Sequence, residues 1–556
     1  MAAPPSEGRE TFNVLDQPWV PSVTTGGESV MLSGRDTLRR AAEIRSIDAE
    51  LPTMTFAIYR LLIAILYRSV ALETDNRPLD VWAKLWAEQD LPMDLIDAYL
   101  GQVHGRFDLV HPTEPFYQVA GLHTAKNEFS GLGKIIADVP NGAAYFTTRA
   151  AERRESIDLA EAARWVVHCQ SYDPSGIKSG AVGDSRVKGG RGYPIGTAWV
   201  GCIGGFLVEG NSLRETLLLN LALGRDATDE VWSDDSDLPV WERIPHTAAE
   251  EDPGAMTGDI PGRAPYGPAD QLTWQSRRIR LRVENGRATG VLISNGDNLW
   301  PQNRQAAEPM TGWRLSEPQS KKYKVPVFMP RVHDPDRAIW RGLGAILPDA
   351  EAAGGTADRA PGLAAPNLVW LQRLRQSGYL DNLQVRVRAV GMVYGSNNSV
   401  VDDIYDDSLR LHIVLLSDRP LQMAALEAVA VAVDAVRLLG TLSRNLTVAA
   451  GGDGDGARAR AQGQGYFRLD AAYRQWVSEL VPGMDPTLAV ANWIHAARAV
   501  VTELADNEID TAGPAAWRGR RDGHRHVDVG LASRWFSAEL RKLLPANNRD
   551  GEQEAS

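Results

Sequence analysis

The chain has little cysteine and no excess of positive charge. Its 556 residues include two cysteines, Cys169 and Cys202, which are too few for a disulfide framework or an all-cysteine zinc site. We therefore expect a cytoplasmic protein with neither a metal nor another cofactor. Acidic residues outnumber basic ones by 71 to 59, a formal net charge of -12, so no overall positive field attracts nucleic acid. Any contact with nucleic acid must be local.

Long hydrophobic runs are also missing. The most apolar helix-like stretch, residues 54–66, is interrupted by Arg60 and is shorter than the roughly 20 residues that span a bilayer. It predicts a core helix, and we expect no membrane contact. The first residues lack the basic head and apolar run of a signal peptide, so export is not expected.

The common local signatures of catalysis do not occur in the sequence. There is no G-x-x-x-x-G-K-[ST] phosphate loop, no G-x-S-x-G nucleophile elbow and no H-E-x-x-H zinc motif. No catalytic residue is predicted on this basis. One alternative stays open, because His333 and Asp334 form an HD pair that could join His524 or His526 in a metal-dependent phosphohydrolase.

What the sequence does have is a glycine-rich, basic segment. Residues 171–205 contain ten glycines, and four cations are interspersed among them: Lys178, Arg186, Lys188 and Arg191. Glycine permits positive φ and close approach of another molecule to the backbone, and exposed amides beside cations suit a polyanion. The alternative is a set of turns that joins two parts of a large domain.

Two further basic elements follow. Arg278, Arg280 and Arg282 alternate with aliphatic residues, which predicts a strand with the arginines on one face. The Asn285-Gly286 pair then predicts a hairpin turn, with Arg287 at or beside its tip. Farther along, Lys321 and Lys322 precede Tyr323. Each element could be an ordinary solvated face or a nucleic-acid surface.

The order of the patterns predicts an α+β protein. Helical and strand-like segments alternate up to about residue 405, which indicates a large mixed α/β N-terminal domain over residues 1–405. Residues 418–545 contain four helical patterns with no strand between them, which predicts a C-terminal four-helix bundle. Residues 546–556 are predicted to form a disordered tail, and the Pro- and Gly-rich composition of residues 246–270 predicts a long surface loop.

Several short motifs occur together in an order that is typical of one family. They are FNVLDQPWVP near the start, PSGIKSG at residues 174–180, a capped TLLLN helix and VGMVYGSNNS at residues 390–399. With the C-terminal bundle, they resemble CasA, the large subunit of the type I-E CRISPR surveillance complex Cascade. The resemblance spans nearly the whole chain.

The resemblance implies a binding role without catalysis. Large subunits of this family recognise the protospacer-adjacent motif in double-stranded DNA, mostly from the minor groove, and help to open the duplex for the guide RNA. The implied partners are the other Cascade subunits, the CRISPR RNA, the target duplex with its displaced strand, and a helicase-nuclease recruited after target binding. The bundle is expected to contact neighbouring subunits and the displaced strand.

The resemblance also assigns residues to the DNA motif. The family's glycine loop falls on Ser175, Gly176, Ile177 and Lys178, where close approach to the minor groove requires a residue without a side chain. The family's strand-separating wedge falls on Asn397, Asn398 and Ser399. Asn398 stands where the family has glutamine, and the shorter amide has less reach.

Other assignments concern the guide RNA and the DNA backbone. The family's lysine finger aligns with the predicted hairpin tip, where Arg287 is the nearest cation. The loop that anchors the family's subunit to the guide RNA falls near residues 141–150, with Phe146 as the stacking aromatic. The remaining candidates for backbone contacts are Arg186, Lys188, Arg191, Arg278, Arg280, Arg282, Lys321 and Lys322.

The sequence alone leaves two alternatives to DNA recognition open. The first is the metal-dependent phosphohydrolase that would use His333 and Asp334. The second is a scaffold subunit that makes no direct contact with DNA.

Overall fold

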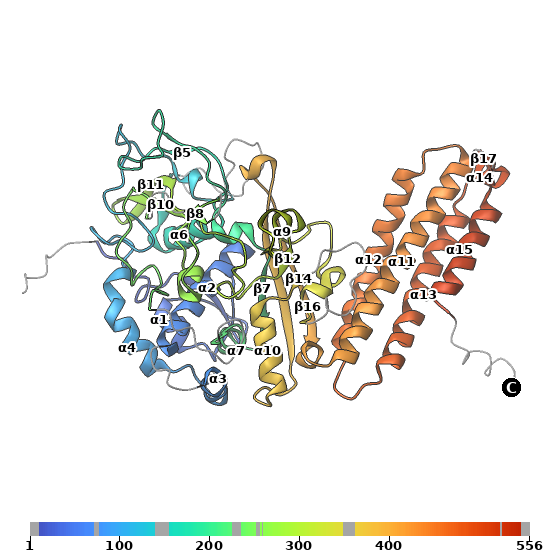
Figure 1. Ribbon diagram of the computed structural model, residues 1–556, viewed down its shortest axis with the longest axis horizontal. Helices are drawn as coiled ribbons and strands as arrows, with labels where there is room; N and C mark the ends of the chain where they lie inside the picture. Colours follow the sequence, from blue (N-terminus) through green and yellow to red (C-terminus); the bar gives the residue numbers. More distant parts are fainter. Residues whose placement is uncertain are drawn as a thin grey trace, which may run out of the picture. The chain divides into compact units, whose positions relative to one another are not determined.

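The structure is a computed structural model that describes residues 10–71, 77–138, 155–224, 235–251, 256–257, 260–348, 362–522 and 525–545. The chain divides into two compact units. Unit 1 comprises Met1–Pro335, Gly355–Leu380 and Val385–Ser408, and unit 2 comprises Asp336–Gly354, Asp381–Gln384 and Leu409–Ser556. The predicted α+β class, with a C-terminal helical bundle, is confirmed (Figure 1). Phe146, His524 and the predicted tail lie outside the described residues.

The central helix of unit 1 is α2 (Pro52–Ala71), which starts with proline in the first turn. Its apolar residues cover all sides, and such a helix has to be buried. The window Pro52–Val70 is apolar and long enough to cross a membrane by composition, yet 94% of it is buried inside the protein. It packs against α6 (Leu159–Tyr172), α4 (Met93–Val103) and α8 (Pro268–Leu272), which agrees with the predicted core helix.

Small antiparallel sheets surround these helices. One three-stranded sheet has the order β2-β1-β3, a second β10-β11-β4, a third β13-β12-β14 and a fourth β16-β15-β7. Their bounds are β1 (Val20–Thr24), β2 (Ser29–Leu32), β3 (Ile44–Ile47), β4 (Ile157–Asp158), β7 (Gly205–Glu209), β10 (Arg277–Glu284), β11 (Arg287–Asn295), β12 (Trp313–Leu315), β13 (Phe328–Pro330), β14 (Gly362–Leu363), β15 (Gln384–Tyr394) and β16 (Val401–His412).

Shorter elements complete the described part of unit 1. The helices are α1 (Gly34–Arg39), α3 (Pro78–Ala87), α7 (Leu213–Leu219), α9 (Glu317–Tyr323) and α10 (Pro366–Gln376). Two-stranded ribbons are formed by β5 (Lys178–Ser179) with β6 (Arg191–Gly192) and by β8 (Met256–Thr257) with β9 (Ile260–Pro261).

The predicted hairpin at Asn285-Gly286 is confirmed. Strands β10 and β11 pair antiparallel, and both turn residues have positive φ, 52° and 70°. Asparagine and glycine tolerate this left-handed conformation better than other residues, and it matches the twist of a tight hairpin.

The prediction of a surface loop over residues 246–270 is wrong for its last part. Arg263, Ala269 and Asp270 are buried, and α8 begins at Pro268. The carboxylate of Asp270 accepts hydrogen bonds from the guanidinium of Arg263, and this pairing allows both charges to be buried. Composition alone therefore underestimated how much of this segment is core.

Unit 2 is built on long helices. Within its described residues these are α11 (Arg419–Ala450), α12 (Asp455–Ser478), α13 (Pro486–Asp510) and α15 (Val529–Leu543), and α11 packs against the other three. Tyr473 lies at the aromatic centre, stacked on Trp340 and edge-on to Trp493.

The expectation that no strand interrupts the bundle is wrong. A short helix α14 (Pro514–Arg518) and a hairpin of β17 (Arg520–Asp522) and β18 (Arg525–Val527) lie between α13 and α15. The hairpin was missed because its strands are only three residues long and rich in arginine, a composition that is not typical of strands.

Candidate nucleic-acid interface

The segment that follows α6 forms a loop with one special glycine. Helix α6 ends at Tyr172, and the four residues Ser175–Lys178, which we call the glycine loop, lead into β5. Gly176 has φ 134°, and a Cβ placed on it would meet nothing within 4 Å. The requirement for glycine is therefore conformational, and the side of Gly176 where a side chain would stand is open. Ile177 beside it is 57% exposed.

The glycine loop touches a turn that is far away in the sequence. The backbone amide of Ser175 donates a hydrogen bond of 2.8 Å to the carbonyl of Asn398. We call Asn397, Asn398 and Ser399 the asparagine turn; it connects β15 to β16. Asn397 and Asn398 have φ of 56° and 55°, and both are exposed. The structure thus brings together the two segments that the resemblance assigns to the DNA motif.

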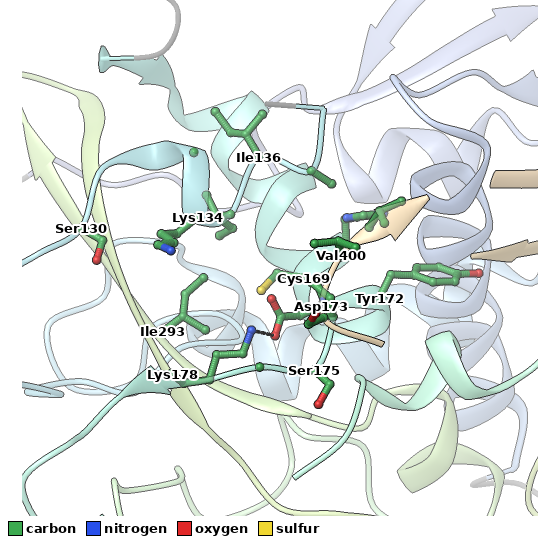
Figure 2. Close-up of a pocket in the computed structure, with 18 of the residues that line it drawn as sticks. Ser130, Lys134, Ile136, Cys169, Tyr172, Asp173, Ser175, Lys178, Ile293 and Val400 are labelled. Atoms are coloured by element: carbon green, nitrogen blue, oxygen red, sulfur yellow. Dashed lines mark ion pairs between the residues drawn. The ribbon is translucent and has the colours of Figure 1, made fainter. Parts of the chain in front are cut away.

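A cavity of about 350 Å³ lies at this junction (Figure 2). The glycine loop lines it together with Ser399, and other walls come from the end of α6 and from β11. Figure 2 shows Lys178 and Asp173 joined by an ion pair, with Lys134, Cys169 and Ile293 around the same space. Polar and apolar groups both face this hollow.

Asp173 organises the charges at the base of the glycine loop. Its Oδ2 lies 2.5 Å from Lys178 Nζ and 2.5 Å from Arg277 Nε. Burial by itself would raise the pKa of Asp173, but the charges and hydrogen bonds of Lys178 and Arg277 hold the pKa below its usual value. The carboxylate is therefore ionised and neutralises cations that would otherwise stand alone.

Arg277 extends this network through the backbone. Its side chain is 1% exposed, and its Nη2 donates to the carbonyl of Gly196 at 2.7 Å and to that of Pro174 at 3.3 Å. The same guanidinium therefore ties the start of the glycine loop to the far end of the glycine-rich segment. Neither Asp173 nor Arg277 was predicted as a site residue, since a buried ion pair between distant segments leaves no local pattern in the sequence.

The predicted cations of the glycine-rich segment differ in their surroundings. Lys178 is 13% exposed and paired with Asp173. Arg186 lies 2.9 Å from Asp184 and 3.2 Å from Glu250, and it also donates to the carbonyl of Gly296. Such pairing favours a structural role for Arg186.

Lys188 and Arg191 are placed differently. They lie at the end of the ribbon where the chain connects β5 to β6, and the backbone amide of each donates to the carbonyl of the other. Both side chains are exposed, and no described residue forms an ion pair with either. Gly180 lies opposite Gly190 in this ribbon, and a Cβ on Gly180 would come within 2.5 Å of the Gly190 backbone. The glycines thus close the ribbon tightly, while the two cations remain available to a ligand.

The three arginines of β10 do share one face, as predicted, but that face is mostly covered. Arg278 is buried and pairs with Asp297. Arg280 donates to the carbonyl of Leu122, and its guanidinium lies 5.5 Å from the centre of the Phe129 ring. Of the three, Arg278 is buried, Arg280 is half-buried and Arg282 is exposed. The burial of Arg278 disfavours a direct phosphate contact there.

The remaining cations lie at the surface. Arg287 donates to the side chain and the carbonyl of Ser156, at 3.0 and 3.1 Å. On α9, Lys321 lies 3.9 Å from Glu317, and Lys322 lies over the ring of Tyr323. The assignment of these three residues to DNA stays a prediction.

The two residues of the HD pair lie in different surroundings, because His333 packs against aromatic rings while Asp334 is exposed. The ring of His333 stacks on Tyr405 at 4.8 Å and meets Phe206 edge-on at 5.0 Å. Its Nε2 lies 3.0 Å from the carbonyl of Gly205, which requires this nitrogen to carry the proton. Burial lowers the pKa of His333 to about 4, so the ring is neutral near pH 7. A nitrogen that donates to a carbonyl cannot at the same time bind a metal ion.

Among the described residues, one group of three could in principle hold a cation. The ligand atoms of His246, Glu251 and Asp297 lie within 4.8 Å of one another. Arg278 pairs with Asp297, and Arg243 approaches Glu251 at 3.5 Å, so the carboxylates are already neutralised. This cluster is better described as an ion-pair network than as a metal site.

Comparison with known proteins identifies the family. The family model for CRISPR-associated protein Cse1 matches residues 13–504. The chain is similar to the crystal structure of Cse1 from Thermobifida fusca, with 43% identity and a TM-score of 0.84 over 96% of this chain and 98% of that one. It is also 29% identical over 347 residues to the CasA/Cse1 protein of Thermus thermophilus. That alignment spans 61% of this chain and 61% of the curated relative's length.

A chain in a solved CRISPR RNA-guided surveillance complex has the same fold. It is 17% identical, with a TM-score of 0.69, and the match covers 96% of this chain and 100% of that one. At this identity the likeness concerns the fold alone. The family model, which covers most of the sequence, is decisive: the chain belongs to the CRISPR-associated protein Cse1 family.

Proposed function

We propose that this protein is the large, non-catalytic subunit of a cytoplasmic CRISPR RNA-guided surveillance complex of the Cascade type, and that it recognises the protospacer-adjacent motif in double-stranded DNA. Membership of the Cse1 family supports the place in the complex. The observation that carries the DNA-binding role is the hydrogen bond from Ser175 to Asn398, because it makes the glycine loop and the asparagine turn one continuous surface.

The geometry of Gly176 suits close approach to a groove floor. Its positive φ turns the chain sharply, and nothing occupies the space where a side chain would stand. A minor groove about 6 Å wide admits backbone more easily than side chains. In this proposal Ser175, Gly176 and Ile177 face the motif, while Asn397, Asn398 and Ser399 separate the strands beside it.

The proposal includes the other partners of such a complex. These are the neighbouring protein subunits, the CRISPR RNA, the target duplex with its displaced strand, and a helicase-nuclease recruited after target binding. Phe146, outside the described residues, keeps its proposed contact with the guide RNA. Arg287 would support the motif contact from the hairpin tip.

A matched pair of variants tests the motif contact in the reconstituted complex. Gly176→Asp introduces a negative side chain into the open space of the glycine loop. Gly378→Asp is the control, since Gly378 also has positive φ, 75°, and nothing within 4 Å of its Cβ position. We expect Gly176→Asp to weaken binding to a cognate target by at least about 10-fold, which corresponds to roughly 1.4 kcal/mol. Gly378→Asp should leave target binding unchanged and should cost less stability than Gly176→Asp, because φ 75° is nearer the left-handed region that aspartate can adopt.

The readout is affinity for a library of targets with randomised motifs. If Gly176→Asp binds cognate targets as tightly as the wild type and keeps the same motif preference, the glycine-loop assignment is wrong. If all DNA crosslinks fall on partner subunits, the protein is a scaffold without direct DNA contact. Phosphohydrolase activity that disappears in His333→Ala would overturn the non-catalytic role.

A further inference from the structure

The last residue of β15, Tyr394, joins the segments that lead into the two parts of the candidate interface. Its hydroxyl donates a hydrogen bond of 2.7 Å to the backbone carbonyl of Tyr172, the last residue of α6. The asparagine turn begins three residues after Tyr394, and the glycine loop begins three residues after Tyr172. The two motif segments are therefore connected at their bases as well as by the bond from Ser175 to Asn398.

The asparagine turn projects beyond β7, the third strand of its sheet. Pairing of β15 with β7 ends where Val390 lies opposite Gly205, so the final residues of β15 lie past the end of this partner. Within the tip, the amide of Gly395 donates to the carbonyl of Val400, and the amide of Asn398 donates to the carbonyl of Gly395. The tip is thus a firm unit, and its position depends on the contacts that hold the end of β15.

The acceptor of the Tyr394 bond is a group that α6 leaves open. The last four carbonyls of an α-helix have no intrahelical partner, and that of Tyr172 is one of them. The next carbonyl, that of Asp173, accepts from the amide of Ala198 at 2.9 Å. Burial raises the pKa of Tyr394 well above its usual value, so the hydroxyl keeps the proton that it donates.

A glycine makes room for this hydroxyl. Gly201 lies in the short 3₁₀ helix η3 (Trp199–Cys202), and a Cβ on it would collide with the Tyr394 hydroxyl and stand 3.0 Å from Cζ of the ring. The φ of Gly201 is not positive, so glycine is required here by space rather than by conformation. Gly201→Ala is therefore a way to displace the hydroxyl without changing Tyr394 itself.

We propose that Tyr394 is a positioning residue that holds the asparagine turn in register with the glycine loop, and that strand opening depends on this bond. This inference rests on the proposed function. A single bond between the tips would let the turn pivot, whereas a second attachment at the base defines its orientation, as a site that acts on a ligand requires. The glycine loop keeps its own support, the ion pairs of Asp173 with Lys178 and Arg277, so loss of the bond displaces mainly the turn.

The positioning role is measured first without DNA. Hydrogen exchange of the full-length chain, followed by mass spectrometry of the peptide that contains Ser175, reports how often its amide leaves the carbonyl of Asn398. We expect Tyr394→Phe to raise this exchange rate about 5-fold, the effect of one lost hydrogen bond. Gly201→Ala should raise it as well, because alanine displaces the same hydroxyl.

The second measurement is strand opening in the assembled complex. Tyr394→Phe should slow the opening of a cognate duplex about 5-fold. It should leave nearly unchanged the affinity for a short duplex that carries the motif but no sequence complementary to the guide. Asn398→Gly lacks the amide that Tyr394 positions, so adding Tyr394→Phe to it should slow opening no further. A general loss of stability would instead weaken both measurements.

Tyr473→Phe in unit 2 is the matched control. The hydroxyl of Tyr473 donates to the carbonyl of Ala425 at 3.0 Å, so this variant loses the same kind of bond between a tyrosine and a helix carbonyl. It should lower thermal stability as Tyr394→Phe does, but it should change neither the exchange of Ser175 nor the rate of strand opening.

Unchanged exchange of Ser175 in Tyr394→Phe would overturn the positioning role, and so would an equal effect of Tyr473→Phe. Faster exchange with opening at the wild-type rate would overturn the link to strand separation, provided that Asn398→Gly slows opening. Further slowing when Tyr394→Phe is added to Asn398→Gly would mean that Tyr394 acts by another route. If Asn398→Gly itself opens duplexes normally, the proposed strand-separating function of the turn is wrong, while faster exchange in Tyr394→Phe still supports the positioning role.

Discussion

The amide of Ser175 donates to the carbonyl of Asn398 across 2.8 Å, and this single bond couples a loop after α6 to a turn between β15 and β16. A displacement of either segment therefore changes the position of the other. Because the bond joins two backbones, side chains at both positions can be changed without removing it. The contributions of conformation and of side-chain chemistry can thus be measured separately.

The asparagine turn offers the first such measurement. Asn398 has φ 55°, which glycine adopts freely, but which costs alanine about 1 kcal/mol. We expect Asn398→Gly to keep the stability of the wild type and Asn398→Ala to lose about 1 kcal/mol. Both variants lack the amide, so both should open a duplex target more slowly in the assembled complex.

The control for strand opening is a target whose first base pairs are already mismatched. Both Asn398 variants should bind this target as fast as the wild type does. A deficit that persists on the opened target would show that Asn398 acts at a step other than strand separation.

The second prediction concerns Asp173. Asp173→Asn removes the negative charge that Lys178 and Arg277 share, and uncompensated buried cations are costly. We expect a loss of about 3 kcal/mol in the free energy of unfolding, measured by urea denaturation. The matched control is Asp434→Asn, in an exposed pair with Arg437, which should cost less than about 1 kcal/mol.

The same variant has a readout in DNA binding. Without Asp173 the ammonium group of Lys178 is free to contact phosphate, so binding to non-cognate DNA should become tighter and more dependent on salt. The ratio between cognate and non-cognate affinity should therefore fall. An unchanged ratio, with stability lowered as expected, would mean that the ion pair has no influence on recognition.

The third prediction separates the cations of the glycine-rich segment. Lys188→Ser and Arg191→Ser should each weaken the binding of all duplex targets to a similar extent and lower the salt slope by about 1. Arg186→Ser should instead lower the thermal stability of the protein, because it leaves Asp184 and Glu250 without their partner. The opposite distribution of effects would reverse the roles assigned to these residues.

The fourth prediction is a pH dependence. Burial, only partly opposed by the hydrogen bond to Gly205, lowers the pKa of His333 from 6.5 to about 4. Between these values the unfolded chain binds a proton that the folded protein excludes, so stability falls as the pH drops from 6.5 towards 4. At pH 5 this loss amounts to about 2 kcal/mol relative to pH 7.

His333→Gln should remove this part of the pH dependence, since glutamine can still donate to the Gly205 carbonyl but does not titrate. The measurement is the difference in unfolding free energy between the variant and the wild type at pH 7 and pH 5. Parallel curves would contradict the assignment of a neutral, buried His333.

Local sequence patterns determined much of the secondary structure. The apolar run within α2 predicted a buried core helix, and the Asn285-Gly286 pair predicted the β10–β11 hairpin. Both patterns depend on residues that are close in the sequence: a nearly continuous apolar run in one case and a pair of residues that tolerate positive φ in the other. The β17–β18 hairpin was missed because its strands are short and carry charges rather than β-branched residues.

For the candidate site, too, one part could be predicted from the sequence and another part depended on the tertiary structure. The sequence by itself placed glycines and cations in one segment and, through the family resemblance, assigned Gly176 and Asn398 to one function. Only the tertiary structure decided that these two segments are in contact and that the ion pair of Asp173 with Arg277 holds the glycine loop in place. It also decided which cations are free to bind a ligand: Arg186 and Arg278 form ion pairs with carboxylates, whereas Lys188 and Arg191 are exposed. The reason is physical: a cation's availability depends on which carboxylates the fold brings within a few ångströms, and those carboxylates come from distant parts of the chain.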